Sequence, residues 1–105
     1  MKLYIKNRLY TKGEKTMQAV ISVMGKDNIG IVAKVSNKCA EYKVNIADVS
    51  QTVLQNYFVM IMLVDIDSIT IPFSEFVDIM SDMGKNNNLE IHTMHEDIFN
   101  SMHRI

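Results

Sequence analysis

The sequence predicts an α+β fold, in which an antiparallel four-stranded sheet carries two helices on one face. Apolar, β-branched segments and segments with helical spacing follow one another in the order strand, helix, strand, strand, helix, strand, and a short tail helix ends the chain. The chain has 105 residues, which is enough for one compact domain and too few for two. Hydrophobic residues make up 48% of it, so a core can form.

The first strand, turn and helix occupy residues 17–43. Met17 to Met24 is apolar and β-branched and is followed by Gly25, which predicts a strand. Gly25 to Gly30 is a predicted turn, in which Asp27 and Asn28 are residue types that favour helix starts. Ile31 to Lys43 is a predicted helix. Its apolar face consists of Ile31, Val32, Val35, Cys39 and Tyr42.

The next two strands form a predicted hairpin. Asn45 to Gln55 mixes apolar and polar residues, a pattern typical of a strand beside a site or an interface. Gln55-Asn56 is a short turn. Tyr57 to Ile66 is almost wholly apolar, which indicates a central strand, and Asp67 to Ile71 is a loop.

A second helix is predicted to begin at Pro72, because proline suits the first turn of a helix. Gly84 is the predicted C-cap of this helix, and Lys85 to Asn88 is a polar turn. Leu89 to Met94 alternates between apolar and polar residues and predicts a strand. His95 to Ile105 is a predicted tail helix.

Residues 1–16 differ from the rest and are predicted to be an N-terminal extension to a domain at 17–105. They carry a single acid, Glu14, and several basic residues: Lys2, Lys6, Arg8, Lys12 and Lys15. Lys2 to Thr11 could add an edge strand. Alternatively, the native protein starts at Met17, because codons for Gly13-Glu14 would resemble a bacterial ribosome-binding site. We favour the second interpretation, and N-terminal sequencing of a native protein that begins at Met1 would refute it.

Charge and composition exclude several classes of function. Eleven basic and twelve acidic residues nearly cancel, which argues against a nucleic-acid or anionic-membrane surface. The longest apolar run, Tyr57 to Val64, is too short for a membrane span, and no signal peptide opens the chain. Cys39 is the only cysteine, so no intrachain disulfide can form, and we expect a cytoplasmic protein.

The predicted arrangement leaves the second face of the sheet bare behind an apolar central strand. Such a face predicts a partner, and the simplest partner is a second copy of the chain. We therefore expect a homodimer.

Two segments carry a family resemblance. GKDNIGIVAKVS, followed by YKVNIADVSQ, resembles the ACT domain, a ferredoxin-like regulatory module that binds amino acids. The likeness covers Met17 to Ile105 and is greatest to the small stand-alone bacterial and archaeal ACT proteins, which are related to the repressor of the glycine-cleavage system. The family often has proline and then glycine before the first helix. Here Ile29 replaces the proline and Gly30 is kept. The second element is the pair Asn45-Ile46.

The resemblance implies a ligand site at the turn before the first helix. The implied residues are Asp27, Asn28, Gly30, Ile31, Val32, Asn45 and Ile46. Asp27 could bind an ammonium group or cap the helix, and Asn28 could bind a carboxylate or only shape the turn. Backbone N–H groups at the helix start suit a carboxylate. Asn45 could reach this corner or only close the turn after the helix.

The sequence therefore favours a non-catalytic sensor, in which a dimer binds an amino acid and modulates a partner protein. The alternative is a ligand-free adaptor that uses the same fold to bind an unknown protein. We expect no catalytic residues and no cofactor, because no Ser-His-Asp, Cys-His or paired-carboxylate arrangement is present. We expect no metal, because His92 and His95 should point to opposite faces of a strand.

Overall fold

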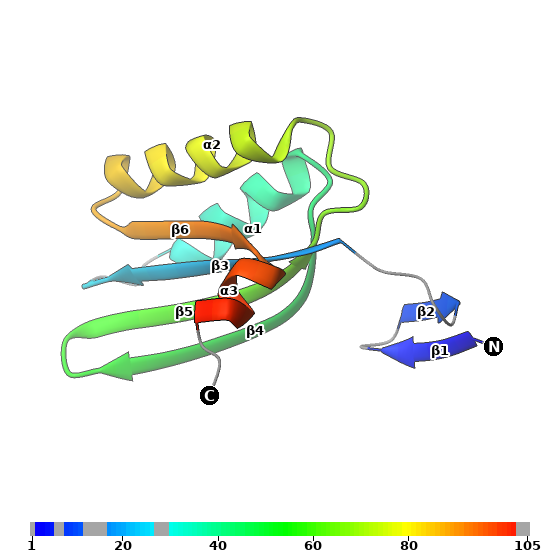
Figure 1. Cartoon of the computed structure of the whole chain (residues 1–105). Coiled ribbons are helices and arrows are strands. Elements are labelled where there is room, and N and C mark those ends of the chain that lie inside the picture. The colour runs from blue at the N-terminus through cyan, green and yellow to red at the C-terminus, as the bar shows by residue number, and fades with distance from the viewer. Residues whose placement is uncertain (1, 6–7, 12–16, 27–29, 103–105) are drawn as a thin grey trace.

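The structure contains an antiparallel four-stranded sheet, which confirms the fold class predicted from the sequence. The computed structural model describes residues 2–5, 8–11, 17–26 and 30–102 (Figure 1). The sheet has the order β4-β5-β3-β6. Its strands are β3 (Gln18–Gly25), β4 (Asn45–Leu54), β5 (Tyr57–Asp65) and β6 (Glu90–His95). Strands β4 and β6 are therefore the two edges.

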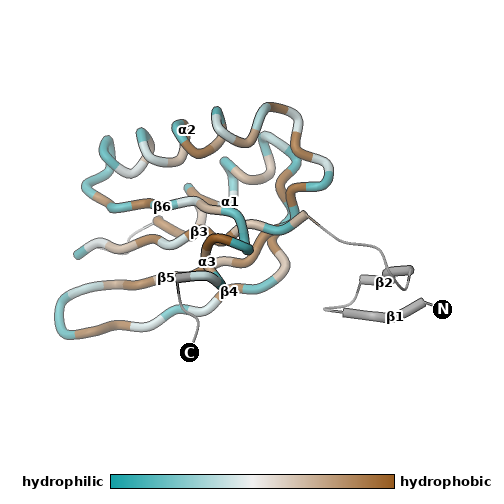
Figure 2. Tube along the Cα trace, viewed as in Figure 1, coloured by the Kyte–Doolittle hydropathy of each residue, from teal (hydrophilic) through white to brown (hydrophobic). Residues whose placement is uncertain are grey.

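Helices α1 (Ile31–Glu41) and α2 (Phe73–Asn86) cover one face of this sheet and bury the core (Figure 1). Hydrophobic and hydrophilic residues alternate along both helices, so that each has an apolar side for the sheet (Figure 2). The largest fully buried side chains come from all of these layers. They include Phe76, Ile21, Met60, Met62 and Met80.

A third helix, α3 (Glu96–Met102), lies on the other face, which the sequence predicted to be bare (Figure 1). A depression between helix and sheet is lined by Phe99 of α3 and by Val20, Ile61 and Leu63 of the strands. Val20 points away from α1 and α2, yet only 4% of its surface is exposed. The prediction of a bare second face is therefore wrong at this place, because α3 lies there with Phe99 beside Val20 (Figure 1).

Helix α1 ends two residues before the predicted Lys43. Tyr42 is its C-cap, and Lys43 takes a left-handed conformation with φ 58°. The N–H of Val44 donates to the carbonyl of Cys39 at 2.8 Å, and the N–H of Lys43 donates to Ala40 at 3.2 Å. This pair of hydrogen bonds is a Schellman motif, formed here without the usual glycine.

The sequence predicted Gly84 as the C-cap of α2, and this is wrong. Gly84 lies inside the helix, and the C-cap is Asn87. A Cβ atom at Gly84 would lie 2.8 Å from the carbonyl oxygen of Leu89 and 3.0 Å from Cγ1 of Ile91. The glycine is needed because the helix and β6 approach each other closely. The left-handed residue after the helix is Asn88, with φ 58°, and the N–H of Leu89 donates to the Gly84 carbonyl at 2.8 Å.

The N-terminal residues do not add an edge strand to the main sheet. Strands β1 (Lys2–Ile5) and β2 (Arg8–Thr11) pair with each other in a separate two-stranded sheet. Whether the native chain begins at Met17 stays a prediction.

Candidate functional site

The corner at the start of α1 is built around Gly30. This residue is the N-cap of α1, with φ 70° and ψ 5°, a left-handed conformation that favours glycine. Gly30 has no side chain to cap the helix, so the first N–H groups of α1 have no partner within the helix or from its N-cap. If a Cβ atom were added to Gly30, no described residue other than the neighbours of Gly30 in the chain would lie within 4 Å of it. Within the described part of the chain, the space beside Gly30 is therefore open.

The next two residues contribute to the corner in different ways. The side chain of Ile31 is buried in the core, with 3% exposed, so only its backbone N–H can meet a ligand. Val32 is 39% exposed and also offers an apolar surface. Asp27 and Asn28 lie outside the described residues, and their alternative roles stay predictions.

Asn45 and Ile46 lie at the opposite end of the sheet from this corner. Asn45 pairs with Asp65, which in turn pairs with Gln18 at the start of β3. Seven residue-to-residue steps along β3 lead from Gln18 to Gly25, which corresponds to about 23 Å at the usual rise of a strand. A single chain therefore does not bring Asn45 to Gly30, and its role in binding stays a prediction.

Strand β4, which Asn45 opens, is an unusually open edge. All but one of its ten residues are exposed, and it contains no lysine, arginine or proline to discourage pairing with another strand. Its outward-facing hydrophobic residues are Ile46, Val49, Val53 and Leu54. Only an irregularity between Ile46 and Asp48 interrupts its register with β5. This edge therefore leaves backbone N–H and C=O groups without a neighbouring strand on one side.

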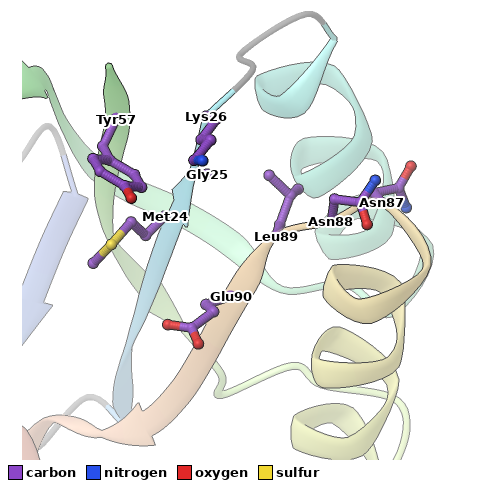
Figure 3. A pocket seen from close by; sticks show the side chains of 8 residues that line it. All are labelled: Met24, Gly25, Lys26, Tyr57, Asn87, Asn88, Leu89 and Glu90. Carbon is purple, nitrogen blue, oxygen red and sulfur yellow. The ribbon is translucent and has the colours of Figure 1, made fainter. Parts of the chain in front are cut away.

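A cleft of about 770 Å³ lies at the same end of the sheet as Gly30 (Figure 3). The end of β3, the start of β5 and the turn between α2 and β6 meet there. It is lined by Met24, Gly25, Lys26, Tyr57, Asn87, Asn88, Leu89 and Glu90. The ammonium of Lys26 lies 5.9 Å from the centroid of the Tyr57 ring, a cation–π distance.

The sequence did not predict this cleft. Its residues come from three separate segments, and the run Asn86 to Asn88 is typical of a plain turn. The available signal is topological: β3 ends where its antiparallel neighbours β5 and β6 begin, so polar residues at those ends must converge.

One hydrogen bond joins the cleft to helix α1. Lys34, in the first turn after Gly30, donates from Nζ to Oδ1 of Asn87 at 2.7 Å. Asn87 itself donates from Nδ2 to the carbonyl of Met83 at 2.8 Å, which fixes its amide against α2.

Other chemistry finds little support in the described residues. No group of three His, Cys, Asp or Glu side chains among them could hold a metal ion. Cys39 is 1% exposed, and its burial raises the pKa of the thiol to about 11, so the thiol stays protonated and is a poor nucleophile. This agrees with the predicted place of Cys39 on the apolar face of the helix. None of the described helices has the length and apolar character needed to cross a membrane.

The model of the ACT domain family matches residues 17–88, which span β3, α1, β4, β5 and α2. The chain belongs to the ACT domain family. A UPF0237 protein of Listeria monocytogenes is 49% identical to it over 89 residues, which cover 85% of this chain and all of that relative.

Two solved structures show the same fold. An ACT domain protein from Streptococcus pneumoniae has a TM-score of 0.72 and 41% identity, over 81% of this chain and 96% of the other. A putative glycine cleavage system transcriptional repressor has a TM-score of 0.62 and 21% identity, over 78% of this ACT chain and 47% of the other. The second likeness concerns the fold alone.

Proposed function

We propose that this ACT protein is a non-catalytic, cytoplasmic sensor, in which two chains pair and bind amino acids at their junction to modulate a partner protein. The observation that carries this proposal is the geometry of β4. The strand is an open edge, and it begins with Asn45 at the end of the sheet away from Gly30.

Pairing of two copies through β4 would bring Asn45 of one copy to the end of the sheet that holds the corner of the other. A twofold-related pair of edge strands runs antiparallel, so the start of one strand lies beside the end of the other. If the ten residues overlap fully, Asn45 of the second copy lies about 5 Å from Leu54 of the first. Leu54 is at the same end of the sheet as the start of α1, two strands or about 10 Å from β3.

The chemistry of the corner suits an amino acid. A carboxylate would accept hydrogen bonds from the N–H groups at the start of α1, where the helix dipole also favours an anion. Val32 would contact the apolar part of the ligand, and Asn45 of the second copy would bind its polar groups. A ligand held by both chains stabilises their pairing, and any partner protein that distinguishes paired from unpaired chains then responds to the amino acid.

The pairing is tested with two charge substitutions on opposite edges of the sheet. Val53→Lys introduces a charge on β4, where Val53 is 65% exposed, and His92→Lys does the same on β6. Sedimentation analysis should show a dimer for the wild type and for His92→Lys and a shift to monomer for Val53→Lys. A wild-type monomer, or equal effects of both substitutions, would refute pairing through β4.

Ligand binding is tested by calorimetry with a panel of amino acids. Asn45→Ala should weaken binding by about tenfold, the usual effect of losing a hydrogen bond to a charged group. Asn37→Ala, an exposed asparagine on α1, is the matched control and should leave the affinity unchanged. If a confirmed dimer gives no heat at millimolar ligand, the sensor is refuted and the ligand-free adaptor is favoured.

A further inference from the structure

We propose that two copies of the chain pair through β4 in one register, which is centred on Gln51 and ends at an extra residue, Ala47. This inference rests on the proposed pairing of the β4 edges and specifies it, because it names the residues that meet. The register follows from three features of the strand. These are the end of its regular part, the direction of its backbone groups and the alternation of its side chains.

The regular part of β4 runs from Asp48 to Leu54. Opposite two successive residues of β5, the strand advances by two residues, from Ile46 to Asp48. Ala47 is therefore an extra residue, and such a bulge disrupts the ladder locally and bends the strand. A second strand can form an unbroken ladder only with the stretch from Asp48 to Leu54.

Every second residue of this stretch directs its backbone N–H and C=O outward, away from β5. The two-residue turn after Leu54 sets the alternation, because the pair that closes such a turn is hydrogen-bonded. Counting back from Leu54, the outward groups belong to Val49, Gln51 and Val53. The N–H of Val49 donates to Oδ1 of Asp48 at 3.0 Å, as expected for a group that no neighbouring strand accepts.

A pair centred on Gln51 joins all of these outward groups. Val49 then lies opposite Val53 of the second copy, and Gln51 lies opposite Gln51. Residues that are directly opposite in an antiparallel ladder point to one face, so like side chains meet. The two valines are 36% and 65% exposed in the single chain, and pairing would remove part of this apolar surface from water. The two Gln51 amides can donate to each other.

The competing register is centred on Ser50 and corresponds to full overlap of the two strands. Both registers keep every side chain on its own face, because they differ by a slide of two residues. The Ser50 centre, however, includes Ala47 of each chain in the ladder. It also places the Gln51 amide against Val49 twice. The Gln51 centre avoids both disadvantages.

The inferred register gives the two parts of β4 different roles. The stretch from Asp48 to Leu54 holds the second copy, whereas Asn45 and Ile46 lie beyond Ala47 and outside the ladder. Asn45 of the second copy would lie two residues, or about 7 Å, past Leu54. This is still the end of the sheet where α1 begins. Asn45 could therefore move toward a ligand without breaking the ladder.

Disulfide trapping tests the register. If Gln51 is the centre, Ser50 lies directly opposite Thr52 of the second copy, at about 4.5 Å between Cα atoms. Ser50→Cys and Thr52→Cys are made as two full-length proteins and are oxidised in a thiol–disulfide buffer, alone and mixed. The mixture should form at least about tenfold more disulfide-linked pairs than either variant alone. Identical positions are about 7–8 Å apart in this register, which is too far for a disulfide.

The wild type is the control for the native thiol. Its only cysteine, Cys39, is 1% exposed and should form no link between chains. Linking of Ser50→Cys or of Thr52→Cys with itself would overturn the Gln51 centre and leave the proposed pairing through β4 intact. If the wild type sediments as a dimer and no combination links, pairing through β4 is refuted, and the register with it. A monomeric wild type would refute both as well.

Discussion

Replacing Gly84 by alanine tests how closely α2 approaches β6. Intrinsic helix propensity alone favours alanine by about 1 kcal/mol at a helix-interior position. The added Cβ, however, would lie 2.8 Å from the carbonyl oxygen of Leu89, with Cγ1 and Cβ of Ile91 at 3.0 and 3.3 Å. The Leu89 backbone cannot withdraw easily, because its N–H donates to the Gly84 carbonyl at 2.8 Å.

The balance of these effects predicts a loss of stability. Forcing a methyl group into a packed interior costs about 1–3 kcal/mol, and the contact with a backbone atom places Gly84 in the upper part of this range. After the gain in propensity, we expect Gly84→Ala to lower the free energy of unfolding by about 1–2 kcal/mol. For a domain of about 100 residues, each 1 kcal/mol lowers the melting temperature by about 4–8 °C.

Urea denaturation followed by circular dichroism measures this change, provided that the slope with urea stays the same. Asp82→Ala, at an exposed position of the same helix, is the control and should raise stability by a few tenths of a kcal/mol. A higher urea midpoint for Gly84→Ala would show that propensity dominates, and the close approach of α2 to β6 would then be wrong.

Three further predictions concern single contacts. Lys43→Gly should raise the free energy of unfolding by about 1 kcal/mol in urea denaturation, because Lys43 holds φ 58°. Burial raises the pKa of Cys39 from 9.0 to about 11, so the folded state holds this proton more tightly. Stability measured by denaturation should be full below pH 9 and fall between pH 9 and 11, and Cys39→Ala should lack this fall. Lys34→Met removes an exposed hydrogen bond to Asn87 and should lower the free energy of unfolding by less than about 1.5 kcal/mol. A larger loss in urea denaturation would show that this contact anchors α1.

The order of the elements was predictable from the sequence, because it depends on local periodicity. An apolar face that must be buried is visible in the alternation of Leu89 to Met94 and in the helical spacing after Pro72. The ends of elements were less predictable. At Gly84 the local pattern indicates a helix end, because glycine is common there. The glycine is instead required by a close tertiary contact with Ile91, which no local pattern reveals. The same limit applies to Lys43, where the chain turns without a glycine.

The candidate sites were predictable only in part, because they depend on which ends of the elements meet. The turn before Gly30 has a local signature, and the left-handed conformation of Gly30, with φ 70°, fits the glycine at that place. Lys26, Tyr57 and Glu90 have no common local pattern, so their convergence appears only when the strand register is known. Asn45 has a family signature, but the register of β4 places it far from the turn in the same chain.

The position of α3 changes which surface a second copy should cover. From the sequence, the apolar second face of the sheet required a partner. In the structure, α3 already shields Val20 on this face, and Ile61 beside it is 40% exposed. The largest exposed apolar fractions on the sheet are instead at Val53 and Leu54, 65% and 63%, on the edge strand β4. An edge strand also offers unpaired backbone groups, and hydrogen bonds to these groups fix the register of a second strand. A flat apolar face has no such hydrogen bonds and fixes the register less well. The structure therefore favours the edge of the sheet over its face as the place for the proposed homodimer, and pairing at this edge would place Asn45 of one chain at the same end of the sheet as the helix start of the other.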